Sequence, residues 1–180
     1  MTSLPLLARL DDRDRALFGR WSLAMHVAPA RRHIVLWQII THCGGVHVSV
    51  AAALLPLILS NGSAPLHSAA GDAALGLALS HLIIQIVKKY VGRPRPSRRT
   101  GCVSLVNEPA CFSFPSGHAT AAMSVAFAYS AAFPAYALPL IIGASVVGFS
   151  RVRLGVHYPG DVLAGQLLAV GTDLALRALW

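Results

Sequence analysis

Five apolar stretches dominate this chain, and they constrain its fold more than any other feature of the sequence. Hydrophobic residues make up 55% of its 180 residues and charged residues only 12%, a balance far from that of a soluble domain. Several stretches fall short of the roughly 20 residues that cross the hydrocarbon core, although a helix that begins inside a protein-lined polar site can be shorter. The sequence therefore predicts an all-α, polytopic transmembrane helical bundle with about five spans, which cover approximately residues 35–60, 69–87, 117–133, 136–149 and 162–179.

The length of the chain limits its organisation. After several spans, 180 residues leave room for one compact bundle, so we expect a single membrane-embedded domain over residues 1–180. Residues 7–26 mix apolar with charged side chains, which predicts an N-terminal helix in the membrane interface or, as the alternative, a solvated amphipathic cap on the bundle. The N-terminus does not follow the basic-then-apolar order of a signal peptide, so we expect no cleaved targeting segment.

Three polar clusters interrupt the apolar sequence, and each lies at the end of a predicted span. Their sequences are KKYVGRPRP at 88–96, PSGH at 115–118 and SRVRLGVHYPGD at 150–161. The second span ends where the first cluster begins, the third span starts at the second cluster, and two crossings later the chain reaches the third cluster. If the third and fourth stretches both span, all three clusters meet on one membrane face.

The first cluster supplies two cations. Lys88 and Arg95 lie seven residues apart, and Gly92 and Pro94 between them end the helix and turn the chain. Alone, a basic run after a transmembrane helix usually anchors at the lipid headgroups. Together with the other clusters, it favours two cations directed at one anionic site.

The second cluster has the features of a helix start. Ser116 is a candidate N-cap before an alanine-rich helix, Gly117 permits close approach of an anion to the backbone, and the helix N-terminus offers free N–H groups. His118 lies beside this predicted anion-binding site, where it could donate a proton to the leaving-group oxygen. The alternative is a structural histidine at a helix start.

The third cluster combines a cation, an imidazole and a carboxylate. Arg151 precedes His157 by six residues, and Asp161 follows four residues later. A carboxylate beside a histidine fixes its tautomer and stabilises the cation formed during nucleophilic attack, which makes His157 a candidate nucleophile for phosphoryl transfer. Asp161 could instead cap the last helix, and the two roles are compatible.

The three clusters together resemble the signature of the type 2 phosphatidic acid phosphatase superfamily, which includes bacterial lipid phosphatases, class A acid phosphatases and vanadium haloperoxidases. That signature reads Lys, six residues, Arg-Pro; then Pro-Ser-Gly-His; then Ser-Arg, five residues, His, three residues, Asp. The resemblance covers about residues 69–180, and the positions that match are Lys88, Arg95, Pro96, Pro115, Ser116, Gly117, His118, Ser150, Arg151, His157 and Asp161.

The resemblance implies a reaction through a phosphohistidine. His157 would attack phosphorus, Asp161 would orient it, and His118 would protonate the leaving oxygen and later assist water. The substrate phosphate would be bound by Lys88, Arg95, Arg151 and the amides of Ser116 and Gly117. Preorganised cations can stabilise the developing charge without a metal or another cofactor, so we expect activity in EDTA.

Other polar residues receive no catalytic role. Arg93, Lys89, Arg98, Arg99 and Arg153 are interpreted as a solvated or lipid-facing basic surface, with binding of phosphate or of a second headgroup as the alternative. His81 and Gln85, one helical turn apart, either support the site from below or form a hydrogen-bonded pair between helices. The remaining histidines show no metal-ligand spacing, so no metal site is expected.

Two signals disagree on the membrane side of the site. With five spans, every Lys and Arg except Arg177 lies on the face of the site, and the positive-inside rule then favours the cytoplasm. Cys102 and Cys111 flank the connecting loop at a spacing that permits a disulfide in an oxidising compartment, and many bacterial relatives act on the outer side. We expect a multi-pass protein of the plasma (inner) membrane with its site on the cytoplasmic face.

The implied substrate is a lipid phosphate or pyrophosphate that enters from the bilayer. Candidates are a polyprenyl phosphate or undecaprenyl pyrophosphate, phosphatidylglycerophosphate, phosphatidic acid, and a polyprenyl-linked sugar phosphate. Three alternatives are a phosphotransferase with an acceptor other than water, a non-enzymatic lipid-binding protein, and a haloperoxidase, although haloperoxidases are soluble and much larger. Beyond lipid and bilayer, no nucleic-acid partner is expected, and the oligomeric state is left open.

Overall fold

The computed structural model describes residues 5–26, 29–59, 63–108 and 111–179, and within these ranges the chain is helical, without a β-strand. Eight α-helices lie in them: α1 (Pro5–Trp21), α2 (Arg31–His42), α3 (Val46–Leu59), α4 (Ala64–Val91), α5 (Pro96–Thr100), α6 (Gly117–Ala132), α7 (Ala137–Arg153) and α8 (Pro159–Arg177). Two short 3₁₀ turns occupy Leu23–Met25 and Pro134–Tyr136. The predicted all-α class is confirmed.

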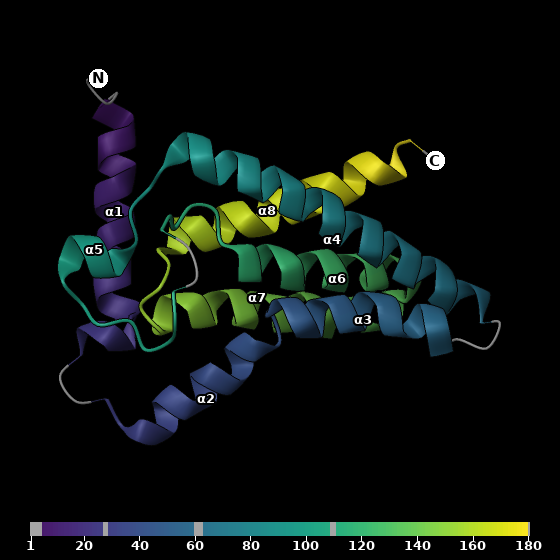
Figure 1. Cartoon of the computed structure of the whole chain (residues 1–180), viewed down its shortest axis with the longest axis horizontal. Coiled ribbons are helices and arrows are strands. Elements are labelled where there is room, and N and C mark those ends of the chain that lie inside the picture. Colours follow the sequence, from purple (N-terminus) through teal and green to yellow (C-terminus); the bar gives the residue numbers. More distant parts are fainter. Residues whose placement is uncertain (1–4, 27–28, 60–62, 109–110, 180) are drawn as a thin grey trace.

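Helix α6 forms the centre of the bundle, in contact with α3, α4, α7 and α8 (Figure 1). Its buried side chains are mostly small, and small residues let helices approach closely in a membrane; they include Ala119, Ala121, Ala126 and Ala128. A hydrogen bond of 3.0 Å joins the hydroxyls of Ser80 and Ser124 across α4 and α6. The Thr120 hydroxyl donates to the Gly165 carbonyl at 2.8 Å and ties α6 to α8.

Two helical segments are long and apolar enough to cross a membrane, namely α4 and residues 134–153, and α2 with α3 would form a third such span. Only 28% of the most apolar window of α4 is buried inside the protein, so outward side chains such as Leu75, Leu79 and Leu82 are left for lipid. Neither α6, with 16 residues, nor α8 qualifies by length and composition. The membrane bundle is supported, and the number of five spans stays a prediction.

The first apolar stretch, expected as one continuous span, is divided into α2 and α3 by a bend of 41°. Two glycines, Gly44 and Gly45, occupy the break, and glycine is a poor helix former. A Cβ atom at Gly44 would lie 2.8 Å from the carbonyl oxygen of His118. The break therefore brings the backbone of the first stretch into close contact with the start of α6, which a larger residue would prevent.

Helix α1 stands across one end of the bundle, beside α5 and the start of α8 (Figure 1). Phe18 is 1% exposed and packs edge-on against Tyr158, with 5.3 Å between ring centroids. Asp14 accepts a hydrogen bond from the backbone N–H of Gly160 at 2.7 Å. The N-terminal helix thus covers the bundle end that carries the three polar clusters, and its placement in a membrane interface stays a prediction.

Candidate active site

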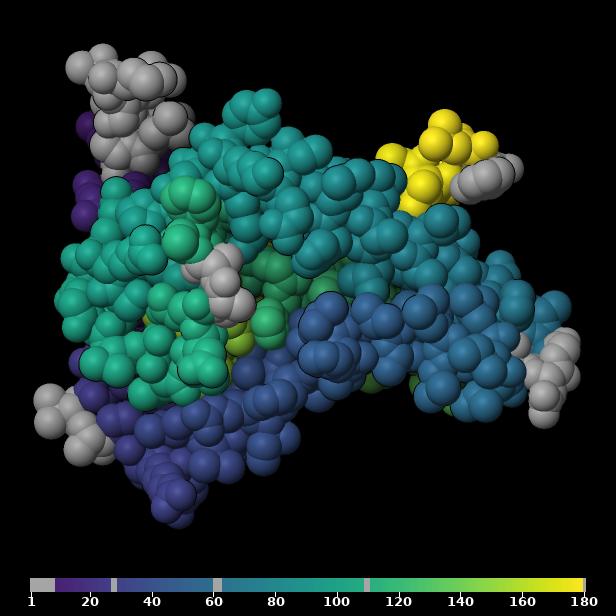
Figure 2. Space-filling view, viewed as in Figure 1, coloured from purple at the N-terminus to yellow at the C-terminus, as the bar shows by residue number. Residues whose placement is uncertain are grey.

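A cavity of about 760 Å³ lies beside α6, between α3 and α4. Figure 2 shows the surface hollowed there, with the green of α6 visible between teal α4 and blue α3. The charged end of this cavity is lined by six of the eight predicted site residues, which come from all three clusters: Lys88, Arg95, Gly117, His118, Arg151 and His157. The other two, Ser116 and Asp161, are fully buried and do not line it.

The turn after α4 positions Arg95. Gly92 ends the helix with a φ of 59°, in the left-handed region that glycine adopts without steric cost. The backbone N–H of Ser113 donates to the carbonyl of Arg93 at 2.8 Å and fixes the loop. Arg95 itself is 2% exposed and donates to the carbonyl of Val156 at 2.9 Å. The guanidinium of the first cluster is therefore anchored on the third cluster.

The start of α6 differs from the sequence prediction at Ser116. Its backbone N–H, predicted to bind phosphate, donates to the carbonyl oxygen of Asp161 at 3.0 Å. Its hydroxyl does not cap the helix and has no hydrogen-bond partner within the described part of the chain. Ser116 thus joins α6 to α8, while Gly117 and His118 are the residues of this cluster that face the cavity.

His157 lies in the turn between α7 and α8, with Asp161 behind it. The His157 Nδ1 atom lies 3.5 Å from Oδ2 of Asp161, an ion-pair distance slightly longer than a normal hydrogen bond. The same Oδ2 accepts a hydrogen bond from the backbone N–H of Tyr158 at 2.9 Å. Asp161 therefore caps α8 and faces His157 at the same time, so the two roles considered from the sequence coexist in the geometry.

Burial lowers the pKa of His157 to about 4, because the imidazolium loses its hydration, and the Arg95 and Arg151 cations add to the effect. The Asp161 carboxylate opposes this shift without cancelling it. His157 is consequently neutral at neutral pH. A neutral imidazole keeps a lone pair on one ring nitrogen, which is the state that a nucleophile requires.

Arg151 is held from the opposite side of the cavity. It is 3% exposed, and its Nη1 donates to the hydroxyl of Thr41 on α2 at 2.7 Å. Its Nε is buried and has no hydrogen-bond partner among the residues that the structure describes. A buried guanidinium with donors to spare is suited to an anion, because an oxyanion would satisfy donors that otherwise cost free energy.

Arg93 was interpreted from the sequence as part of a solvated basic surface, and that interpretation is wrong. Its side chain is 15% exposed and contacts three carboxylates: Asp161 at 2.6 Å, Asp11 at 2.8 Å and Asp14 at 2.8 Å. Its guanidinium also lies 4.1 Å from the centroid of the Tyr158 ring. Burial alone would lower the pKa of Arg93, but the carboxylates outweigh it and raise the pKa. Arg93 thus connects α1 to the carboxylate behind His157.

The other basic residues of that group fall into two kinds. Lys89 and Arg98 are exposed, as interpreted from the sequence. Arg99 forms an ion pair with Asp11 at 2.8 Å, and Arg153 donates to the backbone carbonyl of Trp21 at 2.7 Å. One sequence signal for the ion pairs of Arg93 and Arg99 was missed. Three of the seven acidic residues lie within positions 11–14, on one short helical segment.

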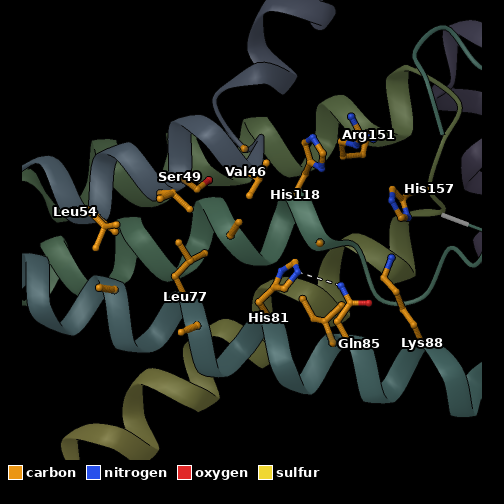
Figure 3. A pocket seen from close by; sticks show the side chains of 18 of the residues that line it. Val46, Ser49, Leu54, Leu77, His81, Gln85, Lys88, His118, Arg151 and His157 are labelled. Carbon is orange, nitrogen blue, oxygen red and sulfur yellow. Dashed lines mark hydrogen bonds between the residues drawn. The ribbon is translucent and has the colours of Figure 1, made fainter. Parts of the chain in front are cut away.

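His81 and Gln85 line the cavity below Lys88. The hydrogen bond between them, 3.0 Å from Nε2 to Nε2, joins successive turns of α4 (Figure 3). The pair therefore lies within one helix, not between two helices. Its position agrees with the first interpretation, in which these residues lie beneath the charged site.

Cys43, Cys102 and Cys111 are free thiols, so the disulfide considered for an oxidising compartment is not formed in this structure. The described ranges contain no group of three or more His, Cys, Asp or Glu residues arranged to hold a metal ion.

Two curated relatives that share part of this sequence are named as phosphatases. The chain is 36% identical over 105 residues to a lipid A 1-phosphatase of Rhizobium johnstonii, covering 56% of this chain and 42% of the relative. It is 36% identical over 96 residues to a decaprenylphosphoryl-5-phosphoribose phosphatase of Mycobacterium tuberculosis, covering 53% and 52%. The chain thus spans about half the length, or somewhat less, of these curated relatives.

A solved structure also matches nearly the whole chain. It is described as the first transmembrane PAP2 type phosphatidylglycerolphosphate phosphatase from Bacillus subtilis, and it superimposes with a TM-score of 0.71 at 25% identity, covering 95% of this chain and 86% of that one. The model of the PAP2 superfamily matches residues 69–180, the region that carries all three clusters. The chain belongs to the PAP2 superfamily.

Proposed function

We propose that this protein is a membrane-embedded phosphatase that hydrolyses a lipid phosphate or pyrophosphate through a phosphohistidine at His157. The observation that carries the proposal is the single cavity in which His157, His118 and three cations meet at one end, while the other end is apolar. Relatives named as lipid phosphatases support the same reaction class. The whole chain would act as one domain.

The mechanism has two displacements at phosphorus. In the first, the free ring nitrogen of His157 attacks phosphorus, the bond to the lipid oxygen breaks, and His118, protonated in the complex with the phosphate anion, gives its proton to that oxygen. In the second, His118 takes a proton from water as the water oxygen attacks, and inorganic phosphate leaves while His157 is regenerated. Asp161 stabilises the positive charge that develops on His157 during the first step.

The cations act on the charge of the phosphoryl group. Lys88, Arg95 and Arg151 would bind its equatorial oxygens, with the backbone of Gly117 close to the same anion. Because these groups are fixed before the substrate arrives, no free energy is spent on reorienting them during the reaction. The unpartnered Nε of Arg151 supports this assignment, since an oxyanion would be its partner.

We also propose that the site faces the cytoplasm from the plasma membrane. Helix α1 contacts the polar clusters through Asp11 and Asp14, so the N-terminal charges and the cluster charges lie at the same end of the bundle. Arg177 lies at the far end of α8, near the C-terminus (Figure 1). An excess of Lys and Arg on one side favours the cytoplasmic side.

The test is release of inorganic phosphate by the purified protein in detergent with EDTA, across a panel of lipid phosphates and pyrophosphates. We expect release from at least one lipid by the wild type and none by His157→Ala. A His157→Ala protein that released phosphate at the wild-type rate would rule out the phosphohistidine. A wild type inactive on every lipid would rule out the phosphatase.

A further inference from the structure

The lining of the cavity changes from charged to polar to apolar along its length. The order of these sections indicates which chemical groups a bound substrate presents at each depth. Figure 3 shows three sections in sequence. The head contains the charged residues around His157, and the tail section, toward Leu54 and Leu77, is apolar apart from Ser49. Between them lies a section that we call the neck, which consists of His81 and Gln85.

The neck lies at a defined depth below the phosphate site. Gln85 and His81 precede Lys88 by three and seven residues on α4, which corresponds to about 4.5 and 10.5 Å along the helix axis. Residues three and seven apart share one helical face, so all three side chains face the same cavity. Ser49, on α3, lies farther from the head, level with Leu77 in the tail section (Figure 3).

The neck has hydrogen-bonding capacity that the protein does not use. In the described part of the chain, His81 and Gln85 form a hydrogen bond only with each other. The second N–H and the oxygen of the Gln85 amide are therefore available. In the adjoining tail section, Ser49 is 2% exposed, and its hydroxyl has no partner among the described residues. Unsatisfied polar groups inside a membrane-spanning segment cost free energy, and such residues mark ligand pathways more often than packing.

We propose that the neck binds a hydrogen-bonding unit of the substrate, a glycerol ester or a sugar, that separates the phosphate being removed from the apolar tail. This proposal rests on the proposed phosphatase function, because it assumes that the phosphate occupies the head. With phosphorus beside His157, the next several ångströms of the substrate lie at the level of Gln85 and His81. Hydroxyl and ester oxygens at that depth would satisfy them.

Two other lipid classes fit the neck less well. A polyprenyl monophosphate presents hydrocarbon directly after its phosphate, so it would leave the neck groups unpaired. A pyrophosphate would place a second anion in the neck, yet the cations that line the cavity, Lys88, Arg95 and Arg151, are all in the head. The neck itself carries no fixed charge, which suits a neutral linker.

The experiment compares kcat/KM of the wild type for four lipids: phosphatidic acid, a polyprenyl-linked sugar phosphate, undecaprenyl phosphate and undecaprenyl pyrophosphate. The variants are His81→Leu and Gln85→Leu, and Ile86→Leu serves as the control because Ile86 lies on the same helix and is exposed outside the cavity. We expect the wild type to prefer phosphatidic acid or the sugar phosphate, and the preferred one identifies the linker as glycerol or sugar.

We expect Gln85→Leu and His81→Leu each to lower kcat/KM for the preferred lipid by up to about tenfold, the worth of one hydrogen bond. Their kcat/KM for undecaprenyl phosphate should stay within about twofold, and Ile86→Leu should change neither value. A wild type that prefers undecaprenyl phosphate or pyrophosphate would overturn the neck proposal. So would variants that lower kcat/KM for all four lipids equally.

A binding measurement keeps the neck and the reaction separate. His157→Ala cannot form the phosphohistidine, so the dissociation constants of the same four lipids can be measured without turnover. Linker-bearing lipids should bind more tightly than undecaprenyl phosphate, and adding Gln85→Leu should remove the difference. If the wild type released no phosphate but this difference were present, the proposed reaction would fail and the neck would stand. Equal binding of all four lipids would overturn the neck proposal even in an active enzyme.

Discussion

Replacing Arg93 with leucine should lower kcat while leaving KM nearly unchanged. Arg93 does not line the cavity, so it has no direct contact with a phosphate bound there. Its Nη1 lies 2.6 Å from Oδ1 of Asp161, whose other oxygen faces His157. Without Arg93, the Asp161 carboxylate that orients the nucleophile is held less firmly. The transition state, in which positive charge develops on His157, is then stabilised less.

The size of the effect follows from the contacts. A hydrogen bond to a charged group contributes about 1.5–3 kcal/mol, and only one of the three Arg93 ion pairs reaches Asp161. If that one contact supports the transition state, kcat should fall roughly 10- to 150-fold. Arg93→Lys keeps a charge but cannot bridge three carboxylates, so it should restore part of the rate.

The assay is steady-state phosphate release from a lipid that the wild type hydrolyses, with thermal unfolding of each variant measured in parallel. Asp11→Asn is the matched control, because it removes one ion pair of Arg93 and leaves the contact with Asp161 in place; its kcat should stay within about threefold. A raised KM with unchanged kcat in Arg93→Lys would instead identify Arg93 as a phosphate ligand. A folded Arg93→Leu protein with wild-type kcat would refute the reasoning.

Four further outcomes are expected. Because the pKa of His157 is lowered to about 4, the neutral nucleophile persists well below pH 6.5, and on the acid side of the pH profile kcat/KM should fall as the pH drops through about 4; an acid-side fall centred at pH 6.5 would contradict this. Gly44→Ala should reduce activity, since its Cβ would lie 2.8 Å from the His118 carbonyl oxygen, whereas Gly71→Ala, with nothing within 4 Å, should not. Activity should be retained in EDTA, because fixed cations supply the charge; loss that added metal restores would refute this. An impermeant maleimide should leave the exposed Cys111 unlabelled in intact cells, and labelling would place the loop outside.

Much of the candidate site could be predicted because its information is local. The residues that end a helix, form the turn and supply the candidate catalytic side chains lie within a few positions of each other, as in the turn from Arg151 to Asp161. Counting membrane crossings then brought the clusters to one face without any knowledge of packing. The structure places Lys88, His118 and His157 on one cavity, as that argument required.

What could not be predicted depends on contacts between distant segments. The ion pair of Arg93 with Asp11 joins residues 82 positions apart, and no local pattern specifies that α1 folds back over the site. The Ser116 amide looked free at a helix N-terminus, but the packing of α8 supplies it with a carbonyl. The bend at Gly44 has a local cause, the glycine pair. The need for glycine there follows only from the close contact with the start of α6, which the sequence does not reveal.

The walls of the cavity have different origins in the chain. The head comes from residues 88–157, inside the region that the family model matches, whereas Gly44, Val46, Ser49, Val50 and Leu54 precede that region. Mutations in α3 can therefore reshape the section proposed to hold the lipid without touching the groups proposed to carry out the chemistry. Evolution could diversify the lipids accepted by such an enzyme by varying one helix, and a chimera that exchanges α3 between relatives would transfer lipid preference while keeping one reaction.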